Sequence, residues 1–352
     1  MIRTRVTIRD VAAVAGVSHQ TVSRVINNSD AVRPETRARV QAAIEHLGFR
    51  PDAIARSMAS GRTGNLACFS PNLTDYTFAS IIDGAEREAR SHGYYLMSAS
   101  APDAGTFALV VDQLIAGRRA DGMMVINPFA DERHHFLPAD FPTVFAGARP
   151  REESANSVAL DDVTVARQAT QHLLELGHRR IGMVTGPLAE DCSQDRSLGY
   201  EQALERAALV GDPLLIVEGD WSAASGYRAF SRFAEGGFPS AIFAQNDQMA
   251  VGILRAARDA GISLPDELSV IGVDDIPLAA FFAPPLTTVR QDFAAIGRRA
   301  AQLLIRAVEQ PLAAREHLLL PGELLVRRST AAPTLHPVSN TIVATSGVTA
   351  RN

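Results

Sequence analysis

The densest run of side chains able to do chemistry lies between residues 18 and 24, which read Ser-His-Gln-Thr-Val-Ser-Arg. Gln20 can make a paired amide contact with adenine, and Arg24 can make a forked contact with guanine. His19 can donate to a purine nitrogen or pack on the sugar-phosphate backbone. Short donors suited to phosphate oxygens, which fix register without reading bases, are Thr21, Ser23, Asn27 and Thr36.

Two short helical patterns position this run. Thr7 can cap the first helix, with Asp10 in the capping-box place three residues later. Gly16 supplies the tight turn, because a β-carbon would penalise its backbone conformation. Ser18 can cap the second helix, which is expected to run to about Asn27. The pattern predicts a helix-turn-helix whose second helix lies in the DNA major groove.

A third helix completes a small core. Pro34 suits its first turn, and Gly48 ends it. A polar, solvated face on a small helical bundle is the alternative interpretation of the second helix. The residues expected to face the core are Ile8, Val11, Ala12 and Val14 in the first helix, Val22, Val25 and Ile26 in the second, and Val40, Ile44 and Leu47 in the third.

The segment from Phe49 to Gly61 has the pattern of a short hinge helix. Pro51 breaks the chain, Asp52 can cap, and one to two helical turns follow. A helix of this length does not persist alone, but it can form when paired with a twin on DNA. A plain linker is the alternative.

Charge is distributed unevenly over the 352 residues. The first 62 residues hold ten Arg and five acidic residues, a net charge of +5, whereas the whole chain carries −5. The remainder is therefore strongly acidic, at −10. A basic head suits a polyanion, and the acidic body must serve another purpose. The sequence contains no Lys, so every fixed cation is a guanidinium, suited to forked contacts.

From Leu66 onward, apolar runs alternate with helical patterns such as residues 78–92 and 165–177. This alternation predicts doubly wound parallel sheets, and about nine strands over roughly 260 residues suit two lobes better than one. Ligands of such sheets bind at the carboxyl ends of the strands, here between the lobes. The expected strands are residues 66–69, 94–98, 122–126, 143–146, 180–184, 214–217, 241–244, 268–273 and 287–290.

Polar residues follow several of these strands. Carboxylate, amide and guanidinium groups can pair with neighbouring hydroxyls, and the single Trp can cover the apolar face of a sugar ring. Each residue alone has a simpler explanation, since a loop Asp is often a helix cap and a lone Trp is often in the core. Together they predict a polyol pocket formed by strand-end residues, which are Asn127, the segment from Gly186 to Arg196, Asp220-Trp221, Asn246-Asp247, Asp274-Asp275 and Gln291.

Other side chains offer no catalytic or metal-binding pattern. Cys68 and Cys192 lie far apart, and His134-His135 lacks a third ligand at a suitable spacing. His178 is expected at a helix end, where the helix dipole accounts for it. We therefore expect no enzyme, metal or cofactor. Without an apolar leader or a run of 18 apolar residues, a cytoplasmic protein without membrane contact is expected.

From residue 6 to about 330 the chain resembles the lactose/galactose repressor (LacI/GalR) family. Several separate runs carry the resemblance, and together they are highly specific. They are residues 7–12 (Thr-Ile-Arg-Asp-Val-Ala), 16–27, 176–181 (Leu-Gly-His-Arg-Arg-Ile), 219–223 (Gly-Asp-Trp-Ser-Ala), 245–250 (Gln-Asn-Asp-Gln-Met-Ala) and 284–292.

The resemblance implies a helix-turn-helix head (residues 1–51), a hinge helix (52–62) and a two-lobed, periplasmic-binding-protein-like body (63–330). The first lobe would comprise about 63–163 plus 292–322, the second about 164–291 plus 323–330, and 331–352 would be a disordered tail.

The resemblance further implies a homodimer whose hinge helices meet in the minor groove, where Met58 would be the apolar wedge. Since the tail lacks Leu heptads, a dimer is expected. The implied DNA-contacting residues are Thr7, Ser18, His19, Gln20, Thr21, Ser23, Arg24, Asn27, Thr36 and Met58.

For the pocket, the resemblance supports the strand-end residues and adds a wall from the first lobe. That wall would contain Pro71, Asp75, Thr77 and Ile81. Asp75 is charged where the family has an apolar group, and Gly147 lies where an Asp is expected. The implied effector-binding set is Asp75, Ile81, Asn127, Arg196, Trp221, Asn246, Asp274 and Gln291.

These expectations describe a transcriptional repressor of sugar-utilisation genes, released from a palindromic operator on double-stranded DNA by a small sugar. Three alternatives stay open: a purine-type corepressor response in which ligand tightens DNA binding, a stand-alone sugar-binding protein, and, more distantly, an enzyme acting on sugars.

Overall fold

The computed structural model describes residues 6–26, 31–49, 61–126, 132–138, 140–147, 149 and 156–334. The chain divides into two compact units, Met1–Gly64 and Asn65–Asn352. Asn127, Met58 and Asn27 lie outside the described residues, as do the predicted hinge helix apart from its last residues and the segment after Thr334.

The described part of the first unit contains three helices, α1 (Ile8–Ala15), α2 (His19–Ile26) and α3 (Pro34–Leu47). The predicted capping box of α1 is present: Asp10 N–H donates to Thr7 Oγ1, and Thr7 N–H donates to Asp10 Oδ2 at 2.8 Å. Gly16 has φ 64° between α1 and α2, a conformation that L side chains rarely adopt. The three helices enclose one apolar core.

The prediction that Val14 of α1 faces the core is wrong. Val14 is 55% exposed, and Ala15 is buried in its place. At 100° per residue, positions 8, 11, 12 and 15 fall within one narrow stripe, whereas position 14 points well away from it.

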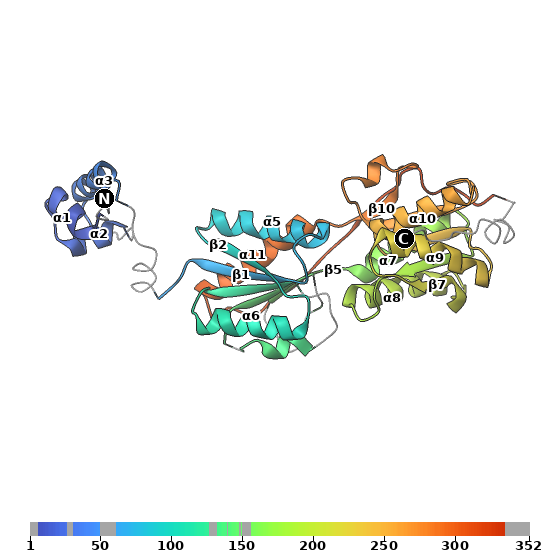
Figure 1. Ribbon diagram of the computed structural model, residues 1–352, viewed down its shortest axis with the longest axis horizontal. Helices are drawn as coiled ribbons and strands as arrows, with labels where there is room; N and C mark the ends of the chain where they lie inside the picture. The colour runs from blue at the N-terminus through green and yellow to red at the C-terminus, as the bar shows by residue number, and fades with distance from the viewer. Residues whose placement is uncertain are drawn as a thin grey trace. The chain divides into compact units, whose positions relative to one another are not determined.

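Across the residues that the structure describes in the second unit, two six-stranded sheets form two lobes (Figure 1). Neighbouring strands are parallel except β10 and β12, which pair antiparallel. The first sheet has the spatial order β11 (His317–Leu320), β5 (Asn156–Leu160), β4 (Thr143–Ala146), β3 (Gly122–Ile126), β1 (Asn65–Ser70) and β2 (Tyr95–Ser100). The second has the order β12 (Glu323–Leu325), β10 (Thr287–Arg290), β9 (Ser269–Asp274), β8 (Ala241–Ala244), β6 (Ile181–Thr185) and β7 (Ile216–Glu218).

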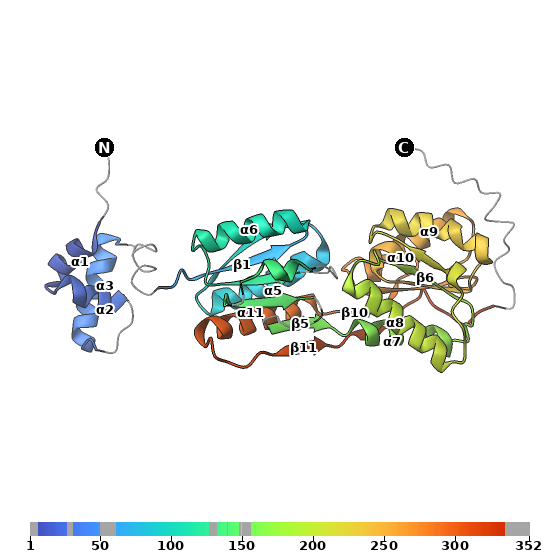
Figure 2. The ribbon, with the colours of Figure 1, turned by 90° about the horizontal axis from the view of Figure 1, so that it is seen from below.

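Helices cover both faces of each sheet, so each lobe has two apolar cores. In the first lobe α5 (Tyr76–Ser91) and α11 (Phe293–Glu309) lie on one face and α6 (Ala104–Ala116) on the other (Figure 1). In the second, α9 (Ala223–Gly236) and α10 (Asp247–Asp259) lie opposite α7 (Asp162–Glu175) and α8 (Asp191–Arg206) (Figure 2). Short 3-10 turns span Glu132–Phe136, Pro213–Leu215 and Ala279–Phe281.

The predicted doubly wound α/β architecture is confirmed, but three strands were missed. The strand β5 begins with two polar residues, Asn156 and Ser157, so only three consecutive apolar residues mark it in the sequence. Both are buried, and Asn156 Oδ1 accepts a hydrogen bond from Glu316 N–H, so burial leaves this oxygen satisfied. The other two, β11 and β12, are short strands at the edges of their sheets.

The chain passes between the lobes after β5, after β10 and between β11 and β12. After the last crossing the chain runs along the second lobe, where Ser269 Oγ accepts from Ala331 N–H at 3.0 Å. The beginning of the predicted tail is therefore held by hydrogen bonds.

His178 was expected to pair with a helix dipole, and this expectation is wrong. Its side chain is buried between Ser240 Oγ, at 2.9 Å from Nδ1, and Ser269 Oγ, at 3.2 Å from Nε2. Its Nε2 also lies 2.9 Å from the Ala331 carbonyl oxygen, which can only accept, so Nε2 donates. Burial lowers the pKa of His178, and the imidazole therefore serves as a neutral tie between the lobe and its last segment.

Candidate functional site

The outer face of α2 presents polar side chains with few partners of their own. His19, Gln20 and Arg24 are exposed, and no hydrogen bond is recorded for their side chains among the described residues. Ser23 is half-buried on the same helix, while Val22 and Val25 face the core. This division leaves one face of α2 free for a partner outside the unit.

The remaining candidates in this unit are engaged locally. Ser18 Oγ accepts from Thr21 N–H at 3.1 Å, and the two hydroxyl oxygens lie 3.0 Å apart. Thr7 is exposed within its capping box, and Thr36 is half-buried in the first turn of α3. These hydroxyls lie at helix starts, where backbone N–H groups are also available to phosphate.

In the second unit, a cavity of about 390 Å³ lies between the two lobes at the carboxyl ends of their strands. The first lobe supplies mostly apolar residues, and the second lobe supplies mostly polar ones. The apolar side includes Phe78, Ile81, Ile126, Leu160 and Phe293; the polar side includes Glu190, Arg196, Asp220, Trp221, Asn246, Gln248 and Asp274.

Arg196 is the central cation of this cavity and is only 5% exposed. Its Nε donates to Asp162 Oδ1 at 2.7 Å, its Nη2 donates to Gln291 Oε1 at 3.1 Å, and its Nη1 donates to the Gln245 carbonyl. Gln291 Nε2 donates to Asp162 Oδ1 at 3.2 Å. The network joins α7, α8, β8 and β10, so it fixes the guanidinium before any ligand arrives.

Trp221 adopts a left-handed backbone conformation, with φ 69°, which directs its ring across Gly186. A β-carbon at position 186 would lie 2.0 Å from the indole ring, so only glycine leaves this space. The indole Nε1 donates to Glu190 Oε2 at 2.9 Å, and the Arg196 guanidinium carbon lies 5.7 Å from the ring centroid. The ring is thereby held at the cavity by both hydrogen bonding and cation–π attraction.

Three of the carboxyl groups that line the cavity, those of Asp162, Glu190 and Asp274, are shifted towards the neutral form. Burial raises the pKa of Asp162 and of Asp274, and Arg196 opposes both shifts. Burial likewise raises the pKa of Glu190, against the hydrogen bond from Trp221. Behind the cavity, burial raises the pKa of Asp247 to about 7. The site therefore contains a surplus of acidic groups that burial disfavours as anions.

Two predicted residues are helix caps at the cavity. Asn246 Oδ1 accepts from Met249 N–H at 2.8 Å, and its Nδ2 donates to the Trp221 carbonyl at 3.0 Å. Asp75 Oδ1 accepts from Thr77 N–H at 2.9 Å.

The structure brings together Asp75, Ile81, Arg196, Trp221, Asn246 and Asp274 around this cavity. Gln291 is not among its lining residues and instead positions Arg196. Sequence reasoning missed Asp162, Glu190 and Gln245. Asp162 is the second residue after the end of β5 at Leu160. Because β5 was not predicted, Asp162 was not recognised as a polar residue that follows a strand.

One ion pair joins the lobes beside the cavity. Arg149, from the segment between β4 and β5, donates from Nε to Asp195 Oδ2 at 2.8 Å and from Nη2 to Asp195 Oδ1 at 2.5 Å. Asp195 lies on α8, and the arginine side chain is 40% exposed. This forked contact links the first lobe to α8 of the second.

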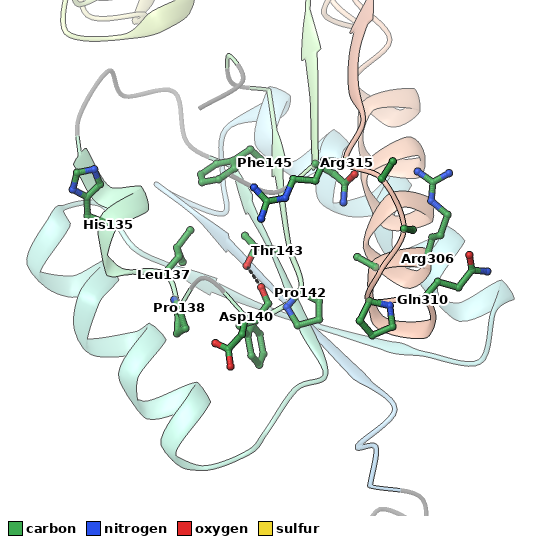
Figure 3. Close-up of a pocket in the computed structure, with 16 residues that line it drawn as sticks. His135, Leu137, Pro138, Asp140, Pro142, Thr143, Phe145, Arg306, Gln310 and Arg315 are labelled. Atoms are coloured by element: carbon green, nitrogen blue, oxygen red, sulfur yellow. Dashed lines mark hydrogen bonds between the residues drawn. The ribbon is translucent and has the colours of Figure 1, made fainter. Parts of the chain in front are cut away.

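A larger cavity, of about 660 Å³, lies wholly within the first lobe at the amino ends of β4 and β5 (Figure 3). Arg306 and Arg315 approach it from one side, and His135 and Leu137 from the other. None of the predicted effector-binding residues that the structure describes lies there. The smaller cavity is the better candidate because its polar groups are buried and organised before ligand binding.

Among the described residues, no group of three or more His, Cys, Asp or Glu side chains is arranged to hold a metal ion. Nor does any helix in that part of the chain have the length and apolar character needed to cross a membrane.

Comparison with known proteins decides the family. Residues 7–52 match the family described as bacterial regulatory proteins, lacI family, and residues 170–330 match a periplasmic binding protein-like domain. The HTH-type transcriptional repressor CytR of Escherichia coli (strain K12) is 34% identical over 94% of this chain and 97% of its own. The chain belongs to the lacI family of bacterial transcriptional regulators.

Other members of this family resemble the chain over a similar length. The HTH-type transcriptional repressor PurR of Haemophilus influenzae (strain PittEE) is 32% identical over 92% of this chain and 98% of its own. The structure of the Lac repressor dimer bound to operator and the anti-inducer ONPF has a TM-score of 0.84 at 30% identity, covering 94% of this chain and 100% of that one. A complex of the transcriptional regulator CelR with cellobiose has a TM-score of 0.72 at 32% identity, covering 92% and 100%.

Proposed function

We propose that this lacI-family regulator represses transcription as a homodimer on a palindromic operator and is released when a small polyhydroxylated effector occupies the cavity between its lobes. The observation that carries the proposal is the exposed polar face of α2, with His19, Gln20 and Arg24. Gln20 and Arg24 would read base edges, while Thr7, Ser18, Thr21, Ser23, Asn27 and Thr36 would contact the backbone.

A homodimer is supported by apolar side chains left in solvent. On the first lobe Tyr95 is 74% exposed on the edge strand β2, and on the second lobe Phe281 is 82% exposed beside Leu278. A second copy would cover such side chains, and the similar Lac repressor structure is that of a dimer. Two heads would then read half-sites about one helical turn apart, with Met58 of each copy as the minor-groove wedge.

A sugar is the ligand class that best fits the cavity. Trp221 offers an aromatic face, and Arg196, Asn246 and Asp274 offer hydrogen-bonding groups around it, with Asp75 and Ile81 from the first lobe. We assign Asn127 to the same site. The cellobiose complex of CelR is a relative with such a ligand. We further propose that the protein acts in the cytoplasm and catalyses no reaction.

The proposal is tested by selecting sequences from a pool of random DNA duplexes with the purified full-length protein. Inverted half-sites should be enriched, and anisotropy of the selected duplex should show salt-sensitive binding. Single sugars are then added. Release by a sugar supports the proposed repressor, tightening by a ligand reverses the sign of the switch, and the absence of any enriched sequence overturns DNA recognition.

A further inference from the structure

The cavity between the lobes holds more carboxyl groups than the one arginine among its described lining residues can pair with. Arg196 is paired with Asp162, and Asp220 accepts from Ser222 N–H at 3.0 Å and lies 3.3 Å from Arg228 Nη2. No ion pair is recorded among the described residues for three further carboxyl groups that line the same cavity. These are Asp75, Glu190 and Asp274.

Asp274 is the most informative of the three. It ends β9, is only 7% exposed and lines the cavity, yet no donor to its carboxylate is recorded within the described part of the chain. Burial of a carboxylate without a donor is costly, so the group is poised for a ligand that supplies one. Burial raises the pKa of Asp274; Arg196 opposes this shift, while Asp247, Asp75 and Asp162 reinforce it.

Asp75 and Glu190 face the same space from two elements. Asp75 of the first lobe lines the same cavity as Glu190 and Asp274 of the second. Its negative charge adds to the burial that raises the pKa of both groups. Asp75 uses Oδ1 to cap α5, and Glu190 uses Oε2 to hold Trp221. Each retains a second oxygen for which no hydrogen bond is recorded among the described residues.

This arrangement favours an organic cation over a metal ion. The acidic groups are not arranged to hold a metal ion among the described residues. An organic ammonium group is less demanding in geometry, because its three N–H donors can reach separate carboxylates. A phosphorylated or carboxylated ligand would instead add a further acidic group to a cavity whose carboxyl groups already outnumber Arg196.

We propose that the effector carries an ammonium group, and that an amino sugar binds with this group between Asp75 and Asp274 and its ring against Trp221. The inference rests on the proposed function and adds the charge of its ligand. Ligand binding would draw the two lobes together through opposite charge, since Asp75 and Asp274 belong to different lobes.

The single Trp of the chain makes the test direct, because Trp221 lies in this cavity and its fluorescence reports occupancy. The full-length protein is titrated with matched sugars that differ in one substituent. D-Glucosamine is compared with D-glucose and N-acetyl-D-glucosamine, D-galactosamine with D-galactose, and the β-1,4-linked glucosamine dimer with cellobiose. At least one amine should bind about tenfold or more tightly than its hydroxyl twin, as expected for a charge-assisted hydrogen bond.

Two substitutions locate the ammonium group without changing side-chain shape. Asp274→Asn removes the charge and keeps a residue tolerant of φ 115°, and Asp75→Asn retains a good helix cap. Each should abolish most of the amine preference, measured as the ratio of the affinity for the amine to the affinity for its hydroxyl counterpart. Asp220→Asn removes an equal charge from the rim and should change the preference less than threefold. Thermal unfolding confirms that the variants fold.

Hydroxyl or acetylated twins that bind as tightly as the amines overturn the proposal, as does a preference that survives Asp274→Asn and Asp75→Asn together. Binding by neither series also overturns it. Operator binding measured on the same samples separates the proposed function from the proposal of an ammonium group. If operator binding is intact and neutral sugars bind tightly, only the ammonium group is refuted. If sequence-specific DNA binding is absent, the proposed function is refuted.

Discussion

The outer face of α2 and the polar wall of the interlobe cavity contain similar side chains in opposite circumstances. On α2, Arg24 and Gln20 are exposed, and no hydrogen bond is recorded for their side chains in the described part of the chain. In the cavity, Arg196 is 5% exposed and engages Asp162, Gln291 and a backbone carbonyl.

The difference teaches how one chain can separate recognition from stability. Removing a side chain that is exposed to water changes the free energy of unfolding little. Residues on the outer face of α2 can therefore be substituted without unfolding the first unit. A buried arginine cannot be substituted in this way, because its carboxylate partner would be left buried without a cation. Substitution in the cavity should therefore alter both ligand response and stability, whereas substitution on α2 should alter only DNA binding.

The largest effect is expected for Arg196→Ala. Removing the guanidinium leaves Asp162 buried without its cation, which should lower the free energy of unfolding by about 3–5 kcal/mol and eliminate the effector response. Urea denaturation and Trp221 fluorescence measure the two effects. The double variant Arg196→Met/Asp162→Leu should recover stability but not response. Unchanged stability in the single variant would contradict the buried-pair interpretation.

Arg24→Ala should show the opposite profile. It is expected to weaken binding to the selected operator by about 1–3 kcal/mol and to relax the preference at one base pair. The free energy of unfolding should change by no more than about 0.5 kcal/mol because the side chain is exposed. Anisotropy on operator variants measures the preference, with Gln20→Ala as a matched comparison. An equal loss on every duplex would show that Arg24 contacts only phosphate.

His178→Gln sharpens the comparison through pH. Because burial lowers the pKa of His178 in the folded protein from its ordinary 6.5, the unfolded chain binds the extra proton first as pH falls. The contribution of His178 is therefore present above about pH 6.5 and is lost below it. The difference in unfolding free energy between the native chain and the variant, about 1–3 kcal/mol at pH 8, should shrink towards pH 5. A pH-independent difference would refute the neutral buried imidazole.

Arg149→Ala is expected to have the smallest effect. The pair with Asp195 spans the lobes but is partly exposed, so its loss should change stability by no more than about 1 kcal/mol and effector affinity by a few fold. Asp195→Asn should reproduce the change, and the double variant should add nothing further. Additive effects of the two substitutions would show that the pair does not act as a unit.

The head was largely predictable from sequence because its signals are local. Thr7 with Asp10, Gly16, and Pro34 with Gly48 each act within a few residues, and each has the expected capping or turn geometry. The error at Val14 came from assigning an apolar residue to the core without weighing its angle around the helix.

The cavity was predictable only in part because its organisation depends on distant contacts. Polar residues after strands indicated Arg196, Trp221, Asn246 and Asp274, but nothing local shows that Asp162 pairs with Arg196, 34 residues away. Gln291 was assigned to the ligand and instead positions the guanidinium, since spacing along the chain does not distinguish a group that faces a cavity from one directly behind it.

The central claim is that one chain couples operator binding by its first unit to ligand binding between the lobes of its second. Linkage tests it most directly: operator affinity is measured by anisotropy with and without saturating effector, and effector affinity by Trp221 fluorescence with and without saturating operator. The account predicts that both affinities fall by the same factor, because coupling between sites is reciprocal. An effector affinity that is the same with and without operator, at a cavity that Trp221 shows to be occupied, would contradict it.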